Sequence, residues 1–404
     1  MQAQPVVEHR RTGEILWAFL KLGLTSFGGP VAHLGYFRDE FVVRRRWLSD
    51  SAYADLVALC QFLPGPSSSQ VGYALGLIRG GYLGALAAWA AFTMPSVLLL
   101  LLFAYGATLF GGPVGTGVIH GLKLVACAVV AQAVWGMGRT LCPDLQRLGI
   151  AIFSALMVSL LPTAIAQVGA VAIGILCGMV LCRKVQSKTS GRLAGSVSKR
   201  SAHAAIVAFA VFLFLLPMVA SQFQIQGLAL FDTFYRAGAL VFGGGHVVLP
   251  LLEANLVDTG WVGMDQFLAG YGAVQAVPGP LFSFAAYLGA VVSPEPNGLV
   301  GAAIALVAIY LPGVLLVIGL LPYWDAVRRI PTAQAAVAGA NAAVVGVLAA
   351  ALYDPIWTSA VKNLTDVGLV ALAFGLLAWG RLAPWVVVLF AALAGGMISL
   401  LGLG

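Results

Sequence analysis

A Pro-Gly-Pro triplet interrupts an apolar stretch at Pro64, Gly65 and Pro66, and the hydroxyl residues Ser67 and Ser68 follow it at once. Proline and glycine end a helix, so a new helix is expected to start at these serines, with backbone amides that have no partner inside that helix. Such a helix start carries a partial positive charge and can bind an anion. The triplet therefore predicts a binding site for a negatively charged ligand. A kinked helix that only packs well is the alternative reading.

The same features recur about 215 residues further along the chain, so the sequence contains an internal repeat. The paired positions are Phe27-Gly28-Gly29 with Phe242-Gly243-Gly244, Gln61 with Gln275, Pro64-Gly65-Pro66 with Pro278-Gly279-Pro280, Pro95 with Pro312, and Lys21 with Arg236. Order and spacing are kept in both copies, which favours a function for the breaks.

The glycine motifs form the second element of each copy. Glycine pairs at Gly28-Gly29 and Gly243-Gly244 allow a positive φ and a close approach of the backbone to an ion. Small residues at helix contacts are the alternative reading. We expect the glycine motif and the triplet of the same half to face each other around a substrate, with Gln61, Gln275 and Ser283 among the binding residues.

Two cations, Lys21 and Arg236, lie inside apolar runs. A cation there costs about 3 kcal/mol on insertion scales and usually faces a partner or a transport pathway. Their equivalent positions predict a symmetric clamp around an anion. Snorkelling to the membrane surface, or for Arg236 an ion pair with Asp232, is the alternative.

Other candidate groups carry weaker signals. Asp55 and Glu253 lie near the ends of broken segments and could relay protons, with placement at the membrane interface as the alternative. His33 and His246 follow the glycine motifs at non-equivalent positions, so no metal pair is predicted. The cysteines lack paired spacing, which argues against zinc and disulfides. We expect no metal and no cofactor. Without a GxxxxGK[ST] run, the chain has no nucleotide motor of its own, so transport would use an ion gradient or run downhill.

Composition defines the elements that must hold these groups. Hydrophobic residues make up 60% of the 404 residues and charged residues only 9%, against roughly a quarter charged in a soluble domain. Apolar runs of about 20 residues recur, which is the length that crosses a bilayer as a helix. The net charge of +7 comes from short basic clusters between these runs. Positive-inside topology explains such clusters better than a nucleic-acid partner does.

The expected fold is all-α: a polytopic helical membrane protein with two inverted-topology repeats and broken or re-entrant helices. Residues 1–182 form the first repeat and 223–404 the second, each with six apolar segments, and 183–222 hold a basic linker and one unmatched transmembrane helix. That extra helix inverts the second repeat, which places the N-terminus in the cytoplasm and the C-terminus outside. Arg44 to Arg46 would then face outside, unless the first two segments re-enter the membrane rather than cross it.

These motifs resemble the chromate transporter (CHR) family, in its long-chain, two-domain form. The residues that carry the resemblance are Ser26 to His33 with Arg44 to Trp47, Ala58 to Pro66 and on to Gln70-Val71-Gly72, Phe92 to Pro95, Phe242 to Gly245, and Ala276 to Pro280. The resemblance covers nearly the whole chain. The second half departs from the first at Gly245, where the first has Pro30, and at Leu281-Phe282, where the first has Ser67-Ser68.

What the resemblance implies is chromate efflux across the bacterial inner (plasma) membrane, driven by the proton motive force, with sulfate as competitor. Our hypothesis places the anion between Lys21, Arg236, the two glycine motifs and the helix starts after the triplets, and exposes it alternately by rocking one half against the other. A sulfate importer or exchanger on the same scaffold is the first rival. An intramembrane chromate reductase, which would need a cofactor signature that the sequence lacks, and a non-transporting scaffold are further rivals. The expected partners are an oxyanion and the lipid bilayer, and a homodimer is left open.

Overall fold

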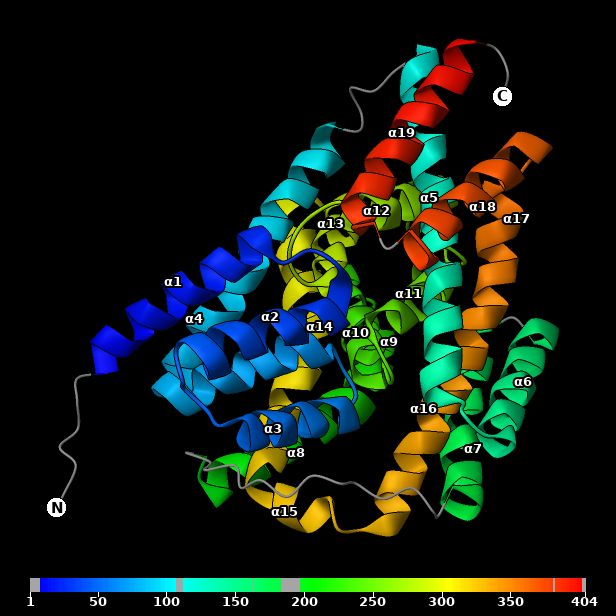
Figure 1. Ribbon diagram of the computed structural model, residues 1–404. Helices are drawn as coiled ribbons and strands as arrows, with labels where there is room; N and C mark the ends of the chain where they lie inside the picture. The colour runs from blue at the N-terminus through cyan, green and yellow to red at the C-terminus, as the bar shows by residue number, and fades with distance from the viewer. Residues whose placement is uncertain (1–7, 107–111, 162, 183–196, 381, 402–404) are drawn as a thin grey trace, which may run out of the picture.

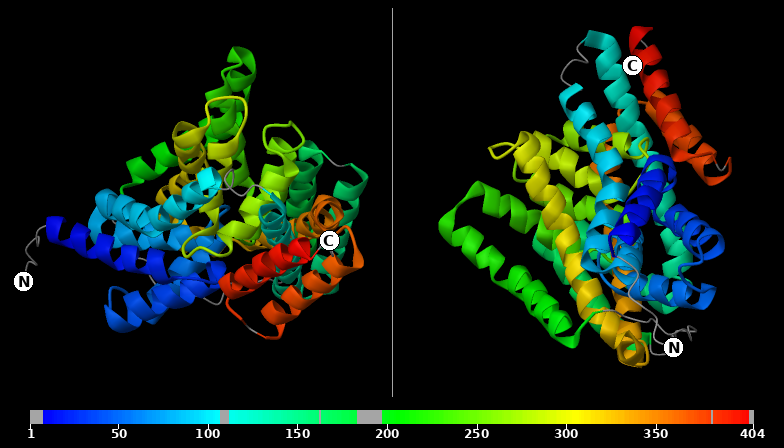
Figure 2. Two further views of the ribbon diagram at one scale, coloured as in Figure 1. Left: turned by 90° about the horizontal axis from the view of Figure 1, so that it is seen from above. Right: turned by 90° about the vertical axis from the view of Figure 1, so that its left-hand side faces the viewer.

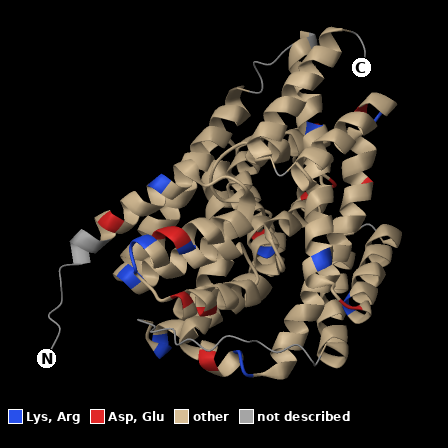
Figure 3. Cartoon of the chain, viewed as in Figure 1, with Lys and Arg blue, Asp and Glu red and all other residues tan. Residues whose placement is uncertain are grey.

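The computed structural model describes residues 8–106, 112–161, 163–182, 197–380 and 382–401, and within these residues it contains helices and no strand (Figure 1). Most of the basic cluster from Arg183 to Arg200, and Arg381, lie outside the described residues. Charged residues are few, and most of each helix carries none (Figure 3). The predicted helical membrane fold is confirmed.

The first half and the connecting segment contain nine α-helices and one π-helical turn in the described residues. They are α1 (Glu8–Thr25), α2 (Gly29–Arg38), the π-turn η1 (Asp39–Arg44), α3 (Asp50–Phe62), α4 (Ser67–Gly106), α5 (Gly112–Leu141), α6 (Leu145–Leu160), α7 (Ala164–Leu181), and in the connection α8 (Lys199–Phe214) and α9 (Leu216–Phe223).

The second half repeats this order of elements. It contains α10 (Gln226–Leu240), η3 (Gly245–Val247), α11 (Val248–Leu256), α12 (Met264–Val274), η4 (Leu281–Ser283), α13 (Phe284–Val291), α14 (Gly298–Leu320), η5 (Leu321–Tyr323), α15 (Trp324–Val327), α16 (Pro331–Ala351), η6 (Leu352–Trp357), α17 (Thr358–Ala360), α18 (Leu364–Ala378) and α19 (Pro384–Leu400).

Six helical stretches in the described residues are long and apolar enough to cross a membrane. They are Ser67–Gly106, Val114–Leu141, Ala164–Leu181, Lys199–Phe223, Gly298–Val327 and Pro331–Ala360. The equivalent helices α5 and α16 run in opposite directions: α5 ends near α6 and α7, whereas α16 starts there, next to α15 (Figure 1). This is the relation expected of inverted repeats.

The first apolar segment is a hairpin rather than a crossing. Helix α1 enters, the chain turns at Gly28 and Gly29 with φ of 102° and 78°, and α2 with η1 returns beside α1. The ring of Phe41 stacks on that of Phe19 at 4.8 Å, and Nη1 of Arg45 lies 3.2 Å from Oε1 of Glu14. Arg45 is therefore close to the start of α1, as the re-entrant alternative requires.

The second apolar segment is a hairpin of the same kind, made by α3 and the first part of α4. Helix α4 then folds back on itself, because Gly80 and Gly81 leave helical geometry and Gly81 takes a φ of 64°. Gly76 and Gly84 meet so closely across this turn that a Cβ on either would overlap the backbone of the other. At the base of the hairpins, Nη2 of Arg79 lies 3.3 Å from Oε2 of Glu14. Both tips therefore point away from this base, towards the second half.

The two halves exchange their last helices. Helices α6 and α7 pack on α16 of the second half, and α18 and α19 pack on α5 of the first (Figure 2). Glycines permit this contact: a Cβ at Gly121 would overlap the backbone of Ala391, and one at the equivalent Gly339 would overlap that of Gly174. Rocking of one half against the other, as we expected from the sequence, would have to break these packed contacts.

Candidate functional site

Four broken segments meet at one place, where each Pro-Gly-Pro triplet bonds to the opposite half. The amide of Gly65 donates to the carbonyl of Val241 at 2.7 Å, and the amide of Gly279 donates to the carbonyl of Ser26 at 2.9 Å. Val241 and Ser26 immediately precede the two glycine motifs. We call this pair of symmetry-related bonds the crossing. These two bonds join motifs of different halves. The contact within one half that we expected is also present, because a Cβ on Gly245 would lie 3.2 Å from Cδ2 of Leu281, which follows Pro280.

Further contacts fix the tips around the crossing. A Cβ on Gly245 would lie 3.6 Å from Cγ of Pro30, so the two glycine motifs touch each other. A Cβ on Gly65 would lie 3.4 Å from Cα of Gly313, next to Pro312 in α14. In the other half a Cβ on Gly279 would lie 3.1 Å from Oγ of Ser96, next to Pro95 in α4. The prolines that repeat along the chain therefore mark where the framework helices hold the tips.

The crossing also gathers buried polar groups. Nδ1 of His33 lies 3.5 Å from Oγ of Ser68, and its Nε2 lies 3.3 Å from the carbonyl of Ser26, so this histidine joins the first glycine motif to the start of α4. Oγ of Ser26 and Nε2 of Gln275 are buried and have no hydrogen-bond partner within the described part of the chain. A buried polar atom without a partner costs free energy, which suits a site that a ligand completes.

The predicted cations lie one turn or so before the tips, each beside an acidic residue of its own half. Nζ of Lys21 is 3.9 Å from Oε2 of Glu40. Nη2 of Arg236 is 2.6 Å from Oδ2 of Asp232, which is the ion pair named as an alternative. Both side chains are about half exposed, at 48% and 41%. Their role as a clamp stays a prediction.

The two candidate proton carriers are buried in protein. Nη1 of Arg328 lies 3.0 Å from both carboxylate oxygens of Asp55, whose side chain is fully buried. This ion pair joins α3 of the first half to the turn after α15 in the second. Glu253 is 8% exposed on α11. Protein therefore encloses the carboxylate of Asp55, and proton relay by either residue stays a prediction.

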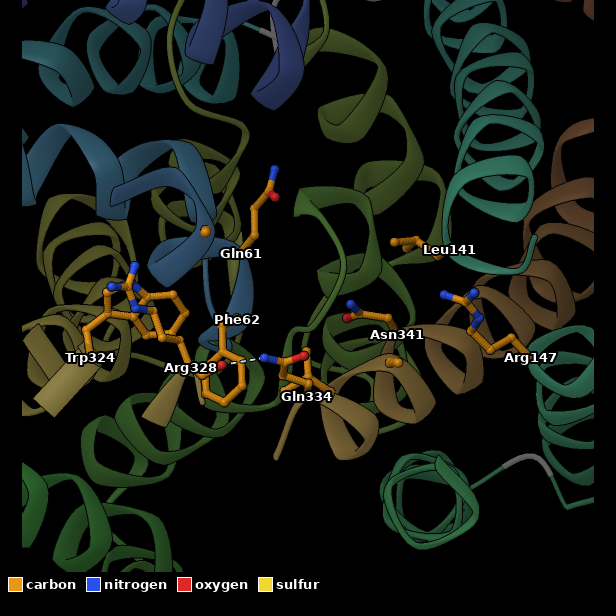
Figure 4. A pocket seen from close by; sticks show the side chains of 11 residues that line it. Gln61, Phe62, Leu141, Arg147, Trp324, Arg328, Gln334 and Asn341 are labelled. Atoms are coloured by element: carbon orange, nitrogen blue, oxygen red, sulfur yellow. Dashed lines mark hydrogen bonds between the residues drawn. The ribbon is translucent and has the colours of Figure 1, made fainter. Parts of the chain in front are cut away.

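A cavity of about 250 Å³ lies next to the crossing, between α3, α6, α15 and α16. Its polar lining consists of Gln61, Arg147, Arg328, Gln334 and Asn341. Figure 4 shows these side chains around the opening, with Arg147 and Arg328 on opposite sides of it. A Cβ on Gly243 would lie 3.4 Å from Oδ1 of Asn341, so the cavity reaches the second glycine motif. We call it the first cavity.

A larger cavity of about 550 Å³ lies between α5, α12, α18 and α19. Its charged residues and histidine are His120, Lys123, Asp265, Lys362 and Asp366. Helix α5 lines it near Lys123 and lines the first cavity at Leu141. At 1.5 Å per residue these positions are about 27 Å apart, close to the thickness of the hydrocarbon layer. This second cavity and the first therefore lie towards opposite faces of the protein.

The sequence reasoning missed most residues of both cavities, including Arg328, Asn341 and Lys123. The signal for Lys123 was present, because it is a cation in an apolar run like Lys21. Arg328 was not selected as a candidate, because its partner Asp55 is 273 residues away in the sequence. In the residues that the structure describes, no group of three or more His, Cys, Asp or Glu side chains is placed to hold a metal ion.

The fold and the crossing define a helical membrane protein whose binding elements are broken segments at the contact of two inverted repeats. This is the architecture in which secondary transporters bind substrates. The family model of the chromate transporters matches residues 13–181 and 228–396, one match for each repeat. The chain belongs to the chromate transporter family.

Three relatives align over nearly their whole length. A chromate transport protein of Pseudomonas aeruginosa is 31% identical over 94% of this chain and 91% of its own. A probable chromate transport protein of Synechococcus elongatus is 28% identical over 93% of both chains. A chromate transport protein of Cupriavidus metallidurans is 26% identical over 95% of this chain and 92% of its own. No solved structure matches the chain.

Proposed function

We propose that this protein is a secondary transporter that exports chromate from the bacterial cytoplasm and uses the proton motive force. Its family, and relatives that are named chromate transport proteins over almost the full length, support the substrate. The observation that carries the binding site is the crossing, where Gly65 and Gly279 each bond to the opposite half. Such a junction gives both repeats access to one bound ion.

The chemistry at the crossing suits a tetrahedral oxyanion. The first backbone amides of α4 have no hydrogen-bond acceptor within the helix, and the partial positive charge of this helix start favours an anion. The hydroxyl of Ser26 and the amide of Gln275 lack partners among the described residues and can donate hydrogen bonds. Lys21 and Arg236, near the tips, would supply positive charge once the anion displaces Glu40 and Asp232 from them.

The orientation follows from the arginines. Arg147 and Arg328 line the first cavity, and basic residues between membrane helices lie mainly in the cytoplasm. We therefore propose that the first cavity opens to the cytoplasm and the second to the outside, with the N-terminus inside and the C-terminus outside. Because the halves exchange helices, we propose that the hairpin tips move against α5 and α16 rather than half against half.

Chromate uptake into everted membrane vesicles tests this function. We expect uptake that a proton gradient stimulates and that sulfate inhibits. Lys21→Ala and Arg236→Ala should abolish uptake without unfolding the protein, while Lys199→Ala, which removes an exposed cation at the start of α8, serves as the matched control.

Each part of the proposal has its own contrary result. Sulfate uptake with chromate only as a competitor would replace the substrate. Uptake that ignores the gradient would remove the proton coupling. Full activity of both the Lys21 and the Arg236 variants would remove the clamp.

A further inference from the structure

Lys123 is a buried cation whose partner is exposed. It lies on α5 with 4% of its surface exposed, and its Nζ donates to Oδ1 of Asp265 on α12 at 2.8 Å. The side chain of Asp265 is 74% exposed. The carboxylate can therefore turn into solvent at little cost, whereas the ammonium group cannot remain buried without a negative partner.

The remaining carboxylate of the second cavity is not available to replace Asp265. Oδ1 of Asp366 lies 2.8 Å from Nε2 of His120, and its Oδ2 accepts the amide of Lys362 at 2.9 Å. Asp366 itself is 4% exposed, so its position is fixed on α18. When Asp265 leaves, the cavity holds two cationic side chains, Lys123 and Lys362, against one carboxylate.

The repeat relates this cavity to the first one. Lys123 and Asn341 each follow by two residues a glycine that packs on the last helix of the other half, Gly121 and Gly339. Lys123 therefore holds the position in the second cavity that Asn341 holds in the first. An amide can donate a hydrogen bond to an oxyanion, and an ammonium group adds a full charge to that bond.

We propose that Lys123 is an oxyanion-binding residue at the outer end of the transport pathway, and that the carboxylate of Asp265 pairs with its ammonium group when no anion is bound. A tetrahedral dianion that arrives from the crossing displaces Asp265, pairs with Lys123 and leaves when Asp265 returns. This inference rests on the proposed function, because it takes the same oxyanion as ligand, but it concerns a separate cavity about 27 Å along α5 from the first.

Anion binding to the purified protein in detergent tests the inference without a transport readout. Thermal unfolding is followed while sulfate or chromate is added at constant ionic strength, with gluconate as the balancing anion. A ligand that binds only the folded state raises the unfolding temperature, because at a free concentration L it stabilises that state by RT ln(1 + L/Kd), so the dependence on anion concentration gives the affinity.

Three variants make the test specific. Lys123→Gln should weaken the affinity for the anion about 30-fold, because truncating one partner of a buried charge pair has effects of this size. Asp265→Asn should bind the anion more tightly than wild type, and its unfolding temperature without oxyanion should fall, since Lys123 then lacks a partner. A gain of affinity in Asp265→Asn cannot come from misfolding. Lys362→Gln removes a cation from the same cavity and is the matched control.

The outcomes separate the two proposals. If wild type binds and transports the oxyanion while Lys123→Gln and Asp265→Asn keep the wild-type affinity, the role of Lys123 is rejected and the proposed function stands. If Lys362→Gln weakens binding as much as Lys123→Gln, the cavity acts only through its net charge and the assignment to Lys123 is rejected. If wild type neither binds nor moves an oxyanion, the proposed function is rejected, and this inference is rejected with it.

Discussion

The first and the second cavity occupy equivalent places in the two repeats, yet they hold their charges in different ways. In the first cavity Arg328 is held by Asp55, whose side chain is fully buried, and Arg147 is held by Asp144 at 2.6 Å. In the second cavity Lys123 is held by Asp265, whose side chain is 74% exposed. Arg328 is therefore locked in place by the protein. The partners of Arg147 and Lys123 are exposed, at 44% for Asp144 and 74% for Asp265, and can be replaced.

The comparison teaches which part of a duplicated structure is free to change. Equivalent glycines, Gly121 and Gly339, hold the framework helices against the exchanged helices in both halves, and any side chain there would separate them. Side chains that point into a cavity have no such restriction, so Asp366 stands where the first repeat has Arg147. The glycine contacts of the framework helices are symmetric, whereas the volumes and the charged linings of the two cavities are not.

The largest expected effect breaks the locked pair of the first cavity. Arg328→Gln leaves the carboxylate of Asp55 buried without its cation, which should lower the free energy of unfolding by about 3 to 5 kcal/mol. Denaturation of the purified protein measures this change. Arg329→Gln, at the exposed neighbouring residue, should have little effect.

The double variant Arg328→Gln with Asp55→Asn sharpens the result, since it removes both charges and should recover much of the stability. If Arg328→Gln alone is as stable as wild type, the ion pair of Arg328 with Asp55 is no more firmly held than that of Lys123 with Asp265.

A change of intermediate size makes the first cavity resemble the second. Asn341→Lys places an ammonium group at the position equivalent to Lys123, and Oδ1 of Asn341 has no hydrogen-bond partner in the described residues that the change would remove. We expect the affinity for sulfate or chromate from the cytoplasmic side to rise about tenfold, as for a new charge-assisted hydrogen bond. Anion titration of everted vesicles measures it, and Asn341→Met controls for side-chain volume. An unchanged affinity would mean that the two positions are not functionally equivalent.

The smallest effect compares the caps that begin α6 and α18. The side chain of Asp144 accepts from the amide of Arg147, and the side chain of the equivalent Asn363 accepts from the amide of Asp366. Asp144→Ala and Asn363→Ala should each lower the free energy of unfolding by about 1 kcal/mol at neutral pH.

Only the aspartate cap should depend on pH. The hydrogen bond from the Arg147 side chain holds the pKa of Asp144 below its usual range, and backbone hydrogen bonds add to this. Its contribution to stability is therefore complete above the usual pKa of an aspartate and is lost as the pH falls through the lowered value. Unfolding experiments across this acid range should show the Asp144→Ala effect disappear while the Asn363→Ala effect persists.

The sequence predicted most of the fold, because an apolar run bounded by polar residues leaves few alternatives to a membrane helix. The first two segments of each half stayed ambiguous, since a run interrupted by Gly28 or Pro64 can either cross or turn back. The contact between Arg45 and Glu14 shows that the first segment turns back as a hairpin. The exchange of helices was not predictable, because a glycine face such as that of Gly121 fits any other small-residue face.

For the site, the sequence pointed to the glycine motifs and the triplets, and contacts within each half bring them together, such as that of Gly245 with Leu281. The backbone bonds between the halves at the crossing were not predicted. The pairing depends on which tips meet in space, and backbone bonds such as that of Gly65 with Val241 leave no mark on residue type. Asn341 carries no charge and lies in an alanine-rich helix, so its sequence context gave no reason to select it.

The exchanged helices also decide how damage to this protein could be repaired by a second mutation. A bulky residue at Gly121 in α5 would push against Ala391 in α19, and these residues belong to different repeats. Mutations that suppress a packing defect in one half should therefore arise in the last helices of the other half. Compensating mutations would then fall in different repeats, even though each repeat is continuous along the chain.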